Sequence, residues 1–209
     1  MPEVYQKKAV IEYIIRSTPI YEFFTVCELA PLEKRVLDCG AGGKYPPLTL
    51  FNDQGYETYG IEISKTQLKR AQAFCKKNDI KLNIFISDMR KIPFSDESFS
   101  FVYAYDSIFF LMEADIAVTM SEIERVMKPE GLCFVTFRSV DDTMGEEFSE
   151  SDPVGIMLGN KEITYHEDNE PEIYFQRFQI LRKKKRIMKT SVKGKKGKRV
   201  YLDYIAEKI

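Results

Sequence analysis

The 209-residue sequence contains no tryptophan, one histidine (His166) and four cysteines, which are Cys27, Cys39, Cys75 and Cys133. No two cysteines lie within five residues of each other, so the sequence has no CxxC pair on which a zinc site could be built. With a single histidine, a Cys/His metal site would need ligands from all over the chain. We therefore predict reduced thiols, a reducing compartment and no bound metal.

The sequence also lacks long hydrophobic runs and an excess of one charge. No stretch of 18 residues is both apolar and uncharged. The N-terminus has neither a basic start nor an uninterrupted apolar core. We therefore expect no membrane span and no signal peptide, and we place the protein in the cytoplasm. Lys plus Arg is 31 against 32 for Asp plus Glu, a net charge of −1 that disfavours a general polyanion binder. The 13% aromatic content excludes a disordered chain.

Short apolar runs alternate with amphipathic stretches through the middle of the sequence. The apolar runs predict strands over 35–39, 56–61, 82–86, 99–105 and 132–137, and the amphipathic stretches predict helices over 45–54, 65–77 and 113–127. Two earlier helices are predicted over 3–16 and 19–29, the second with Thr18 as its cap. Such alternation predicts a doubly wound α/β fold, with a parallel sheet covered on both faces.

The last third of the sequence breaks this alternation. Residues 141–172 hold 11 acidic side chains and one lysine, whereas residues 182–199 hold 11 basic side chains and no acidic one. Alternating apolar residues follow, so we predict an antiparallel hairpin with strands over 178–189 and 199–208. We interpret the lysines as charges that discourage pairing of an edge strand with another molecule, because no aromatic residue for base stacking is interleaved before Tyr201.

The first predicted strand ends in the glycine loop, Asp38-Cys39-Gly40-Ala41-Gly42-Gly43. Glycine is needed where a backbone turns sharply, and where a ligand approaches main-chain N–H groups with no Cβ in the way. Open α/β sheets bind ligands at such loops, and three glycines in four residues exceed what a plain turn requires. The dinucleotide fingerprint G-x-G-x-x-G is absent, because Tyr45 stands at its third glycine. The loop therefore favours a ligand without a pyrophosphate.

Polar residues also end the next three predicted strands. Glu62 ends the second strand and can accept hydrogen bonds from a ribose diol, with a solvated carboxylate as the simpler alternative. After the third strand, Asp88 can accept the amine of an adenine while Met89 packs on the ring, or Asp88 can merely cap a turn. The fourth strand ends at Tyr105 and Asp106. We expect all four strand ends to lie at one edge of the sheet and to form one ligand site.

Residues 34–138 resemble the class I S-adenosylmethionine-dependent methyltransferases, and among them the small-molecule-type methyltransferase domains. The stretches that carry the resemblance are VLDCGAGG, YGIEIS, ISDMRKIPFSDESFSFVYAYDSI and EIERVMKPEGLCFVTF. The resemblance implies a seven-stranded, mostly parallel, Rossmann-like sheet with an antiparallel last strand, and S-adenosyl-L-methionine as cofactor. It implies cofactor contacts from Asp38, Gly40, Ala41 and Gly42 to the methionine part, from Glu62 to the ribose, from Ile63, Asp88 and Met89 to the adenine, and from Tyr105 beside the acceptor.

The resemblance also implies methyl transfer, but no motif in the sequence identifies the acceptor. Neither a D/N-P-P-Y/F tetrapeptide nor the cysteine motif of 5-methylpyrimidine enzymes is present, so we predict a small-molecule acceptor. The alternatives are an RNA or protein methyltransferase, a non-catalytic cofactor-binding protein and, more remotely, a dinucleotide dehydrogenase. Methyl transfer from a sulfonium depends mainly on alignment, so a base is needed only if the acceptor arrives protonated. His166, Tyr105 and Asp106 are the candidates, although a lone histidine more often has no catalytic role.

We expect one domain over residues 1–209, with a helical cap over 1–30, a lid-like insertion over 139–172 and the hairpin over 178–208. The cap and the insertion should cover the carboxyl edge of the sheet and build the acceptor pocket. Candidate lining residues, which can equally belong to the core, are Tyr5, Tyr13, Phe23 and Phe24. The partners expected are a small-molecule substrate, no nucleic acid and no membrane, with the protein a monomer or a homodimer.

Overall fold

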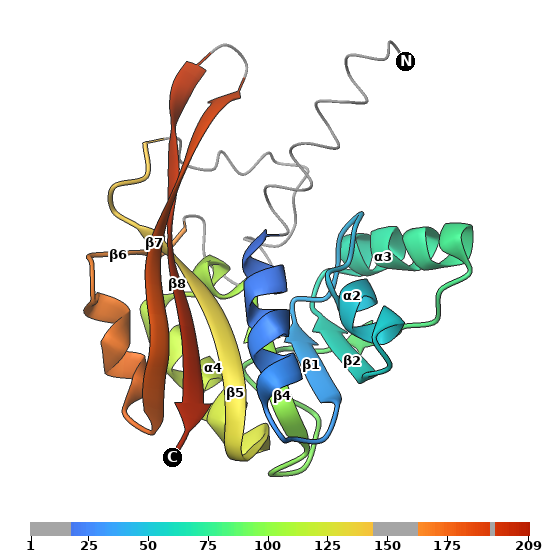
Figure 1. Cartoon of the computed structure of the whole chain (residues 1–209). Coiled ribbons are helices and arrows are strands. Elements are labelled where there is room, and N and C mark those ends of the chain that lie inside the picture. The colour runs from blue at the N-terminus through green and yellow to red at the C-terminus, as the bar shows by residue number, and fades with distance from the viewer. Residues whose placement is uncertain (1–17, 144–162, 193–194) are drawn as a thin grey trace.

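A computed structural model describes residues 18–143, 163–192 and 195–209 (Figure 1). Its strands are β1 (Arg35–Cys39), β2 (Glu57–Glu62), β3 (Asn83–Ile86), β4 (Phe99–Ala104), β5 (Met127–Ser139), β6 (Tyr165–His166), β7 (Phe178–Val192) and β8 (Lys195–Lys208). Its helices are one over 18–29, α2 (Leu48–Asp53), α3 (Lys65–Asn78) and α4 (Glu113–Val126), with 3₁₀ turns at Ile108–Phe110 and Glu170–Phe175. The predicted helix over 3–16, and with it Tyr5 and Tyr13, lies outside the described residues.

All the strands join one sheet. Seven of them follow the order β3-β2-β1-β4-β5-β8-β7, and β6 pairs with the end of β5. The strands β1 to β5 pair with one another in parallel, while β8 runs antiparallel to both β5 and β7. The predicted doubly wound, mostly parallel sheet with a C-terminal antiparallel hairpin is confirmed.

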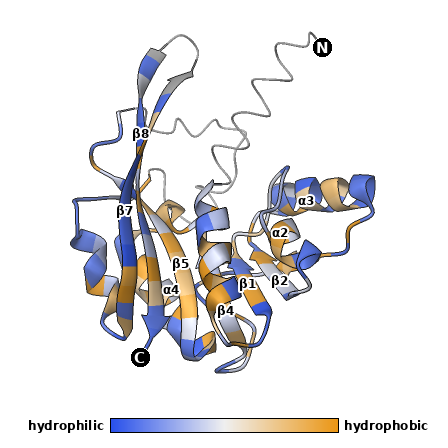
Figure 2. Cartoon of the chain, in the orientation of Figure 1, coloured by the Kyte–Doolittle hydropathy of each residue, from blue (hydrophilic) through white to orange (hydrophobic). Residues whose placement is uncertain are grey.

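Helices cover both faces of the sheet (Figure 1). Because side chains alternate along each strand, β4 and β5 supply one set of apolar residues to each face. α4 packs on the face that carries Val102 and Phe137. The helix over 18–29 and α2 pack on the opposite face, which carries Tyr103 and Phe134. Figure 2 shows the result, an apolar central sheet with hydrophilic residues along β7.

Phe23 belongs to the core rather than to an acceptor pocket. The ring is fully buried, and its centroid lies 6.2 Å from those of Phe51 and Tyr103 and 5.6 Å from that of Phe134. Burying one such ring contributes about 1.5–3 kcal/mol to stability. This packing fixes the helix over 18–29 on the sheet.

The hairpin of β7 and β8 projects past the carboxyl edge of the parallel strands (Figure 1). Arg138, near the end of β5, pairs with Tyr201, and β8 extends six residues further, to Lys195, in pairing with β7. At about 3.4 Å per residue this ribbon is roughly 20 Å long. Nearer the sheet, consecutive lysines of β7 form ion pairs of 2.5–2.7 Å, namely Lys183 with Glu172, Lys184 with Glu22, and Lys185 with Asp141 and Asp168. These ion pairs therefore connect the edge strand β7 to residues of the helix over 18–29, of the 3₁₀ turn at 170–175 and of the loops around 141 and 168.

None of the described helices is long and apolar enough to cross a membrane.

Candidate functional site

The segments predicted to bind a ligand meet at the carboxyl edge of the sheet. Asp38 of β1 is in register with Gly60 of β2 and with Tyr103 of β4. Glu62, at the end of β2, pairs with Ile86 at the end of β3. Because these strands are parallel neighbours, the residues that follow them emerge side by side.

The glycine loop turns its main-chain N–H groups toward the protein itself. Gly40, Ala41, Gly42 and Gly43 donate in turn to the Ile61 carbonyl (2.9 Å), the Ile61 carbonyl (3.0 Å), Glu62 Oε2 (3.0 Å) and the Gln67 carbonyl (3.0 Å). The expectation that a ligand approaches these N–H groups is therefore corrected, because the end of β2 and the start of α3 already occupy all four donors. The main-chain polar groups that the glycine loop itself leaves to a ligand are therefore carbonyl oxygens.

The loop's own packing requires glycine at two positions. Gly40 has a φ of +122°, which residues with a Cβ rarely adopt, and a Cβ built there would lie 2.5 Å from Ser107 Cβ. Ser107 Oγ in turn donates to the Cys39 carbonyl at 2.6 Å, which fastens the end of β4 to the loop. At Gly42, a Cβ would overlap the Glu62 carboxylate. Neighbouring side chains, rather than a ligand, take the space that a Cβ would need.

Glu62 is held by two main-chain hydrogen bonds. Its side chain points into the loop, where Oε2 accepts from Gly42 N–H at 3.0 Å and Oε1 accepts from Ser64 N–H at 2.7 Å. The residue is only 8% exposed, so the alternative of a solvated carboxylate is wrong. Burial raises the pKa of Glu62, and these hydrogen bonds oppose that shift. The Ile63 main-chain N–H also acts on this carboxylate, so of its about four acceptor positions at least one remains for a hydroxyl of a ligand.

Asp38 is the most deeply buried carboxyl group at this edge. It is 1% exposed, and Oδ2 has no hydrogen-bond partner among the described residues. Burial raises the pKa of Asp38 well above its usual value, the nearby Tyr103 hydroxyl opposes the shift, and the charge of Glu62 adds to it. A buried polar atom without a partner costs about 1–3 kcal/mol, so native proteins rarely keep one without a reason. A ligand with a cationic donor would fit this atom.

Arg90 holds Asp88 in the loop that follows β3. The Arg90 guanidinium donates from Nε to both carboxylate oxygens of Asp88 (3.1 and 3.0 Å) and from Nη2 to Oδ2 (2.7 Å), while the Arg90 main-chain N–H donates to Oδ1 (2.9 Å). Burial acts to raise the pKa of Asp88, but the contacts with Arg90 outweigh it and lower the pKa. Asp88 thus stays ionised and tied to its turn. Nearby, Ile63 and Met89 are half-buried and pack against the core cluster on the α4 face.

Tyr105 and Asp106 follow β4. The Tyr105 ring stacks on Phe134, with centroids 5.9 Å apart, and the Arg186 guanidinium lies 6.0 Å from the Tyr105 ring centroid. Burial raises the pKa of Tyr105, and the charge of Asp106 adds to the shift, so the phenol is neutral at physiological pH. Asp106 has a φ of 52°, the left-handed conformation that turns the chain toward Ser107.

His166 lies apart from Tyr105. It is 1% exposed, its ring meets Phe137 edge-on at 5.3 Å, and Nε2 is 3.5 Å from the Tyr174 hydroxyl. Burial lowers the pKa of His166. Phe137 packs on the α4 face of the sheet, whereas Tyr105 packs on the opposite face. The structure therefore does not bring His166 together with Tyr105.

Sequence reasoning missed the polar residues Arg186 and Asp203, of which Arg186 lies next to the aromatic ring of Tyr201. Arg186 forms a buried ion pair with Asp203 (Nε to Oδ2, 2.7 Å), and its guanidinium lies 4.1 Å from the centroid of the Tyr201 ring. Thr136 Oγ1 donates to Asp203 Oδ1 at 3.1 Å. In the hairpin Arg186 faces Tyr201 and Asp203 faces Lys184, so the ion pair is diagonal and only the presence of an Arg and an Asp on the two predicted strands signalled it. Among the described residues, no group of three or more His, Cys, Asp or Glu side chains is arranged to hold a metal ion.

A family comparison covers this edge of the sheet. Residues 37–135 match the family model described as a methyltransferase domain. Over this range, just under half of its length, the chain is similar to methyltransferase domains. The matched range runs from β1 into β5 and includes Asp38, Glu62, Asp88 and Tyr105.

Curated proteins that match part of this chain include methyltransferases. A sterol 24-C-methyltransferase from Gibberella zeae is 33% identical over 100 residues, which cover 47% of this chain and 26% of that protein. A glycine/sarcosine/dimethylglycine N-methyltransferase from Actinopolyspora halophila is 27% identical over 128 residues, 60% of this chain and 21% of that protein. The chain therefore spans about a quarter of the length of these relatives.

Solved structures share the fold. A SAM-dependent methyltransferase from Methanosarcina mazei aligns with a TM-score of 0.62 over 88% of this chain and 97% of that chain, at 17% sequence identity. At this identity the likeness shows a common Rossmann-like architecture, which agrees with the observed sheet order.

Proposed function

We propose that this protein is an S-adenosyl-L-methionine-dependent methyltransferase that acts on a small molecule. The observation that carries the proposal is the set of acceptors at the carboxyl edge. The buried carboxyl groups of Asp38 and Glu62 lie beside a glycine loop whose N–H groups are all occupied. A sulfonium compound with an ammonium group needs acceptors, whereas the pyrophosphate of a dinucleotide needs free N–H donors. The site therefore supports the methyl donor over a dinucleotide.

In this proposal each part of the cofactor has its own residues. The methionine part contacts Asp38, Gly40, Ala41 and Gly42, the ribose hydroxyls donate to Glu62, the adenine lies between Ile63, Met89 and Asp88, and Tyr105 lies on the methyl side. Asp38 Oδ2 is the best-defined element, because a cationic ammonium would give this buried atom the partner that it lacks among the described residues.

The mechanism assigned to the chain is alignment. The bound cofactor would supply an activated methyl group with a neutral leaving group, and positioning of that kind is worth roughly 7–11 kcal/mol. The neutral Tyr105 phenol can orient an acceptor by a hydrogen bond, but it does not take up a proton at neutral pH. Asp106 is the carboxylate next to it and remains the candidate base for an acceptor that arrives protonated.

Two further lines support a small-molecule acceptor in the cytoplasm. The names of the curated relatives refer to a sterol and to glycine derivatives, which are both small molecules but chemically unrelated. These names support the class of acceptor and do not identify it. All four cysteines are free thiols in the structure, in keeping with a reducing compartment.

Calorimetric titration tests the cofactor directly. The purified protein is titrated with S-adenosylmethionine, with S-adenosylhomocysteine and, as a control, with NAD⁺. We expect saturable binding of the first two and none of NAD⁺. Binding of NAD⁺ alone, or of none of the three, would overturn the proposal. A donor with a labelled methyl group, incubated with fractionated metabolites, then identifies the acceptor by transfer of the label.

An RNA acceptor is the second candidate, and one observation favours it. Lys189, Lys196 and Lys198 lie on the projecting hairpin and form no ion pair with any described residue. Phosphate contacts from such lysines would make binding strongly salt-dependent. Filter binding of labelled RNA at increasing salt tests this candidate. A small-molecule enzyme should show no retention that depends on these three lysines.

A further inference from the structure

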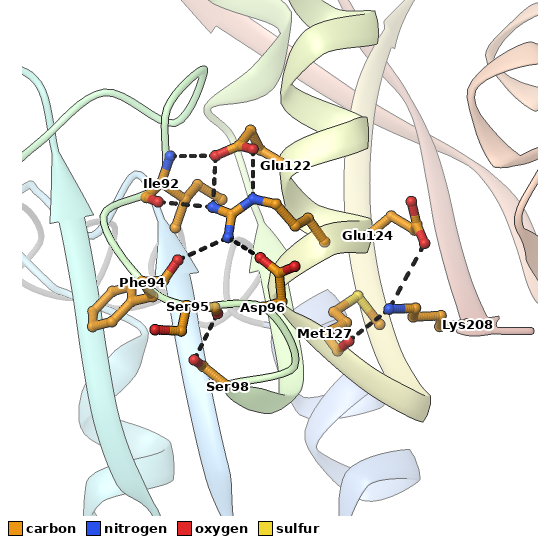
Figure 3. A network of polar contacts seen from close by, with 10 residues as sticks. Ile92, Phe94, Ser95, Asp96, Ser98, Glu122, Glu124, Met127 and Lys208 are labelled. Carbon is orange, nitrogen blue, oxygen red and sulfur yellow. Dashed lines mark hydrogen bonds and ion pairs between the residues drawn. The ribbon is translucent and has the colours of Figure 1, made fainter.

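The loop between β3 and β4 carries Asp88. Side chains of α4 hold the main chain of this loop by hydrogen bonds. One Arg125 guanidinium of α4 donates to the Ile92 and Phe94 carbonyls (2.9 and 2.8 Å) and to Asp96 (2.8 Å), while Glu122 accepts from Ile92 N–H at 2.8 Å (Figure 3). These contacts hold the backbone of residues 92–96 without any help from Asp88 or Arg90.

Arg90 adds a separate link between α4 and the Asp88 side chain. Its Nη1 donates to Asp115 Oδ2 in the first turn of α4 at 2.8 Å, while its Nε and Nη2 hold both oxygens of Asp88. The planar guanidinium is thus fixed by carboxylates on two sides, and all three side chains are half-buried. A lysine at this position would be a single charge that cannot hold both oxygens in one plane.

Three Arg90 donors (the main-chain N–H, Nε and Nη2) leave Asp88 about one of its four acceptor positions, and a carboxylate fixed in this way can only accept there. The 6-amino group of adenine is a donor, whereas hypoxanthine carries an acceptor oxygen at the same position. A carboxylate that cannot rotate away accepts a hydrogen bond from the adenine amine and repels the hypoxanthine oxygen. One that is free to rotate loses much of this discrimination.

We infer that Arg90, held by Asp115, is a positioning residue that fixes Asp88 as the acceptor for the adenine amine, so that the site selects adenine over hypoxanthine. The inference rests on the proposed function, because it concerns the adenine end of the same cofactor. Arg90 acts through Asp88 and is not itself a cofactor contact.

The test compares two ligands that differ only at that position, S-adenosylhomocysteine and its deaminated analogue S-inosylhomocysteine, by calorimetric titration. The wild-type protein should bind the adenosyl compound about ten- to a hundredfold more tightly, the range of one hydrogen bond to a charged group. In Arg90→Ala this ratio should fall toward one. In Asp115→Asn it should fall part of the way, because Arg90 keeps Asp88 but loses its second support.

Two controls separate positioning from structure. Arg177→Ala removes an arginine that is 71% exposed and lies 3.6 Å from Glu124, at the other end of α4, and should leave both affinities unchanged. Arg125→Lys loosens the loop backbone and should weaken both ligands by the same factor, with the ratio retained. If Arg90→Ala is poorly folded, Asp115→Asn alone decides.

Three outcomes would overturn the inference. The first is an equal loss of both ligands in Arg90→Ala and Asp115→Asn, which would make the pair merely structural. The second is an unchanged ratio in both variants. In the third, the wild-type protein binds neither ligand; the proposed function then fails as well, whereas the first two outcomes leave it intact.

Discussion

Glu62 Oε2 accepts a hydrogen bond from the main-chain N–H of Gly42 at 3.0 Å. This contact joins the end of β2 to the glycine loop after β1, and no Cβ could occupy the space between them. The acidic residue and the glycines, which the sequence shows as two separate motifs, therefore form one structural unit. A change at Glu62 should affect both the loop and any ligand beside it.

Glu62→Gln should weaken binding of S-adenosylmethionine by about 1.5–3 kcal/mol, because the amide replaces one charged acceptor by a donor. Calorimetric titration measures the loss. Glu57→Gln is the matched control, since Glu57 begins the same strand and is exposed at its opposite end. Equal affinity of Glu62→Gln and the wild-type protein would remove Glu62 from the site.

Gly40→Ala should destabilise the fold by about 1–3 kcal/mol through backbone strain, with a further loss from the contact with Ser107. Urea unfolding measures the change. Gly55→Ala is the matched control, because Gly55 also has a positive φ (79°) but a Cβ there would meet nothing within 4 Å. If the two variants lose the same free energy, the close contact with Ser107 has no energetic importance.

Asp38 should make stability depend on pH. Its folded pKa lies above the unfolded value of about 3.9, so the native state holds this proton more tightly. That stabilisation is complete below the unfolded pKa and is lost as pH rises through the folded pKa. We therefore expect the stability of Asp38→Asn relative to wild type to increase as pH rises above about 4.

Urea unfolding at a series of pH values measures this difference. Asp53→Asn, at an exposed carboxylate, serves as the control and should follow the wild-type curve. A difference between Asp38→Asn and wild type that stays constant over pH contradicts the prediction. Asp38→Asn should also bind S-adenosylmethionine more weakly, because the ammonium group loses a carboxyl oxygen that can become ionised beside it.

Arg186→Met should destabilise the protein by about 3–5 kcal/mol, because it leaves the Asp203 carboxylate buried without its cation. The double variant Arg186→Met/Asp203→Leu should recover much of the loss, since an apolar pair of similar volume can replace a buried ion pair. Thermal and urea unfolding of the three variants form the test. If the double variant is as unstable as Arg186→Met, the prediction is wrong. Arg186 would then stabilise the protein mainly through its contact with the Tyr201 ring.

The periodicity of the sequence predicted the parallel strands because each is a short buried run bounded by turn residues. Its errors have local causes. α2 begins at Leu48 rather than near residue 45, since Pro46 and Pro47 lack the N–H groups of a helix interior. β5 begins at Met127 rather than at Leu132, because pairing with Phe99 extends it beyond a register shift. Such pairing depends on the neighbouring strand and leaves no mark in a local pattern.

The residue types at the candidate site could be predicted from the sequence. Their hydrogen-bond and ion-pair partners could not. Glycines and acidic residues at strand ends indicated a ligand site, yet the direction of the loop's N–H groups depends on backbone angles such as the φ of Gly40. Likewise, the partners of the β7 lysines come from residues 22, 141, 168 and 172. Only the folded chain brings these charges together, so the basic run alone could not show which of its members are neutralised.

Asp38 also makes the stability of the folded protein depend on the concentration of its ligand. A carboxyl group that is sealed from water and lacks a partner among the described residues makes the ligand-free state less stable than the same fold with a cation beside it. Any compound bound only by the native state shifts the folding equilibrium, by about 2.7 kcal/mol at a hundredfold excess over its dissociation constant. Under methyl-donor starvation we therefore expect faster proteolytic turnover of this protein, so that its abundance follows the metabolite it would consume.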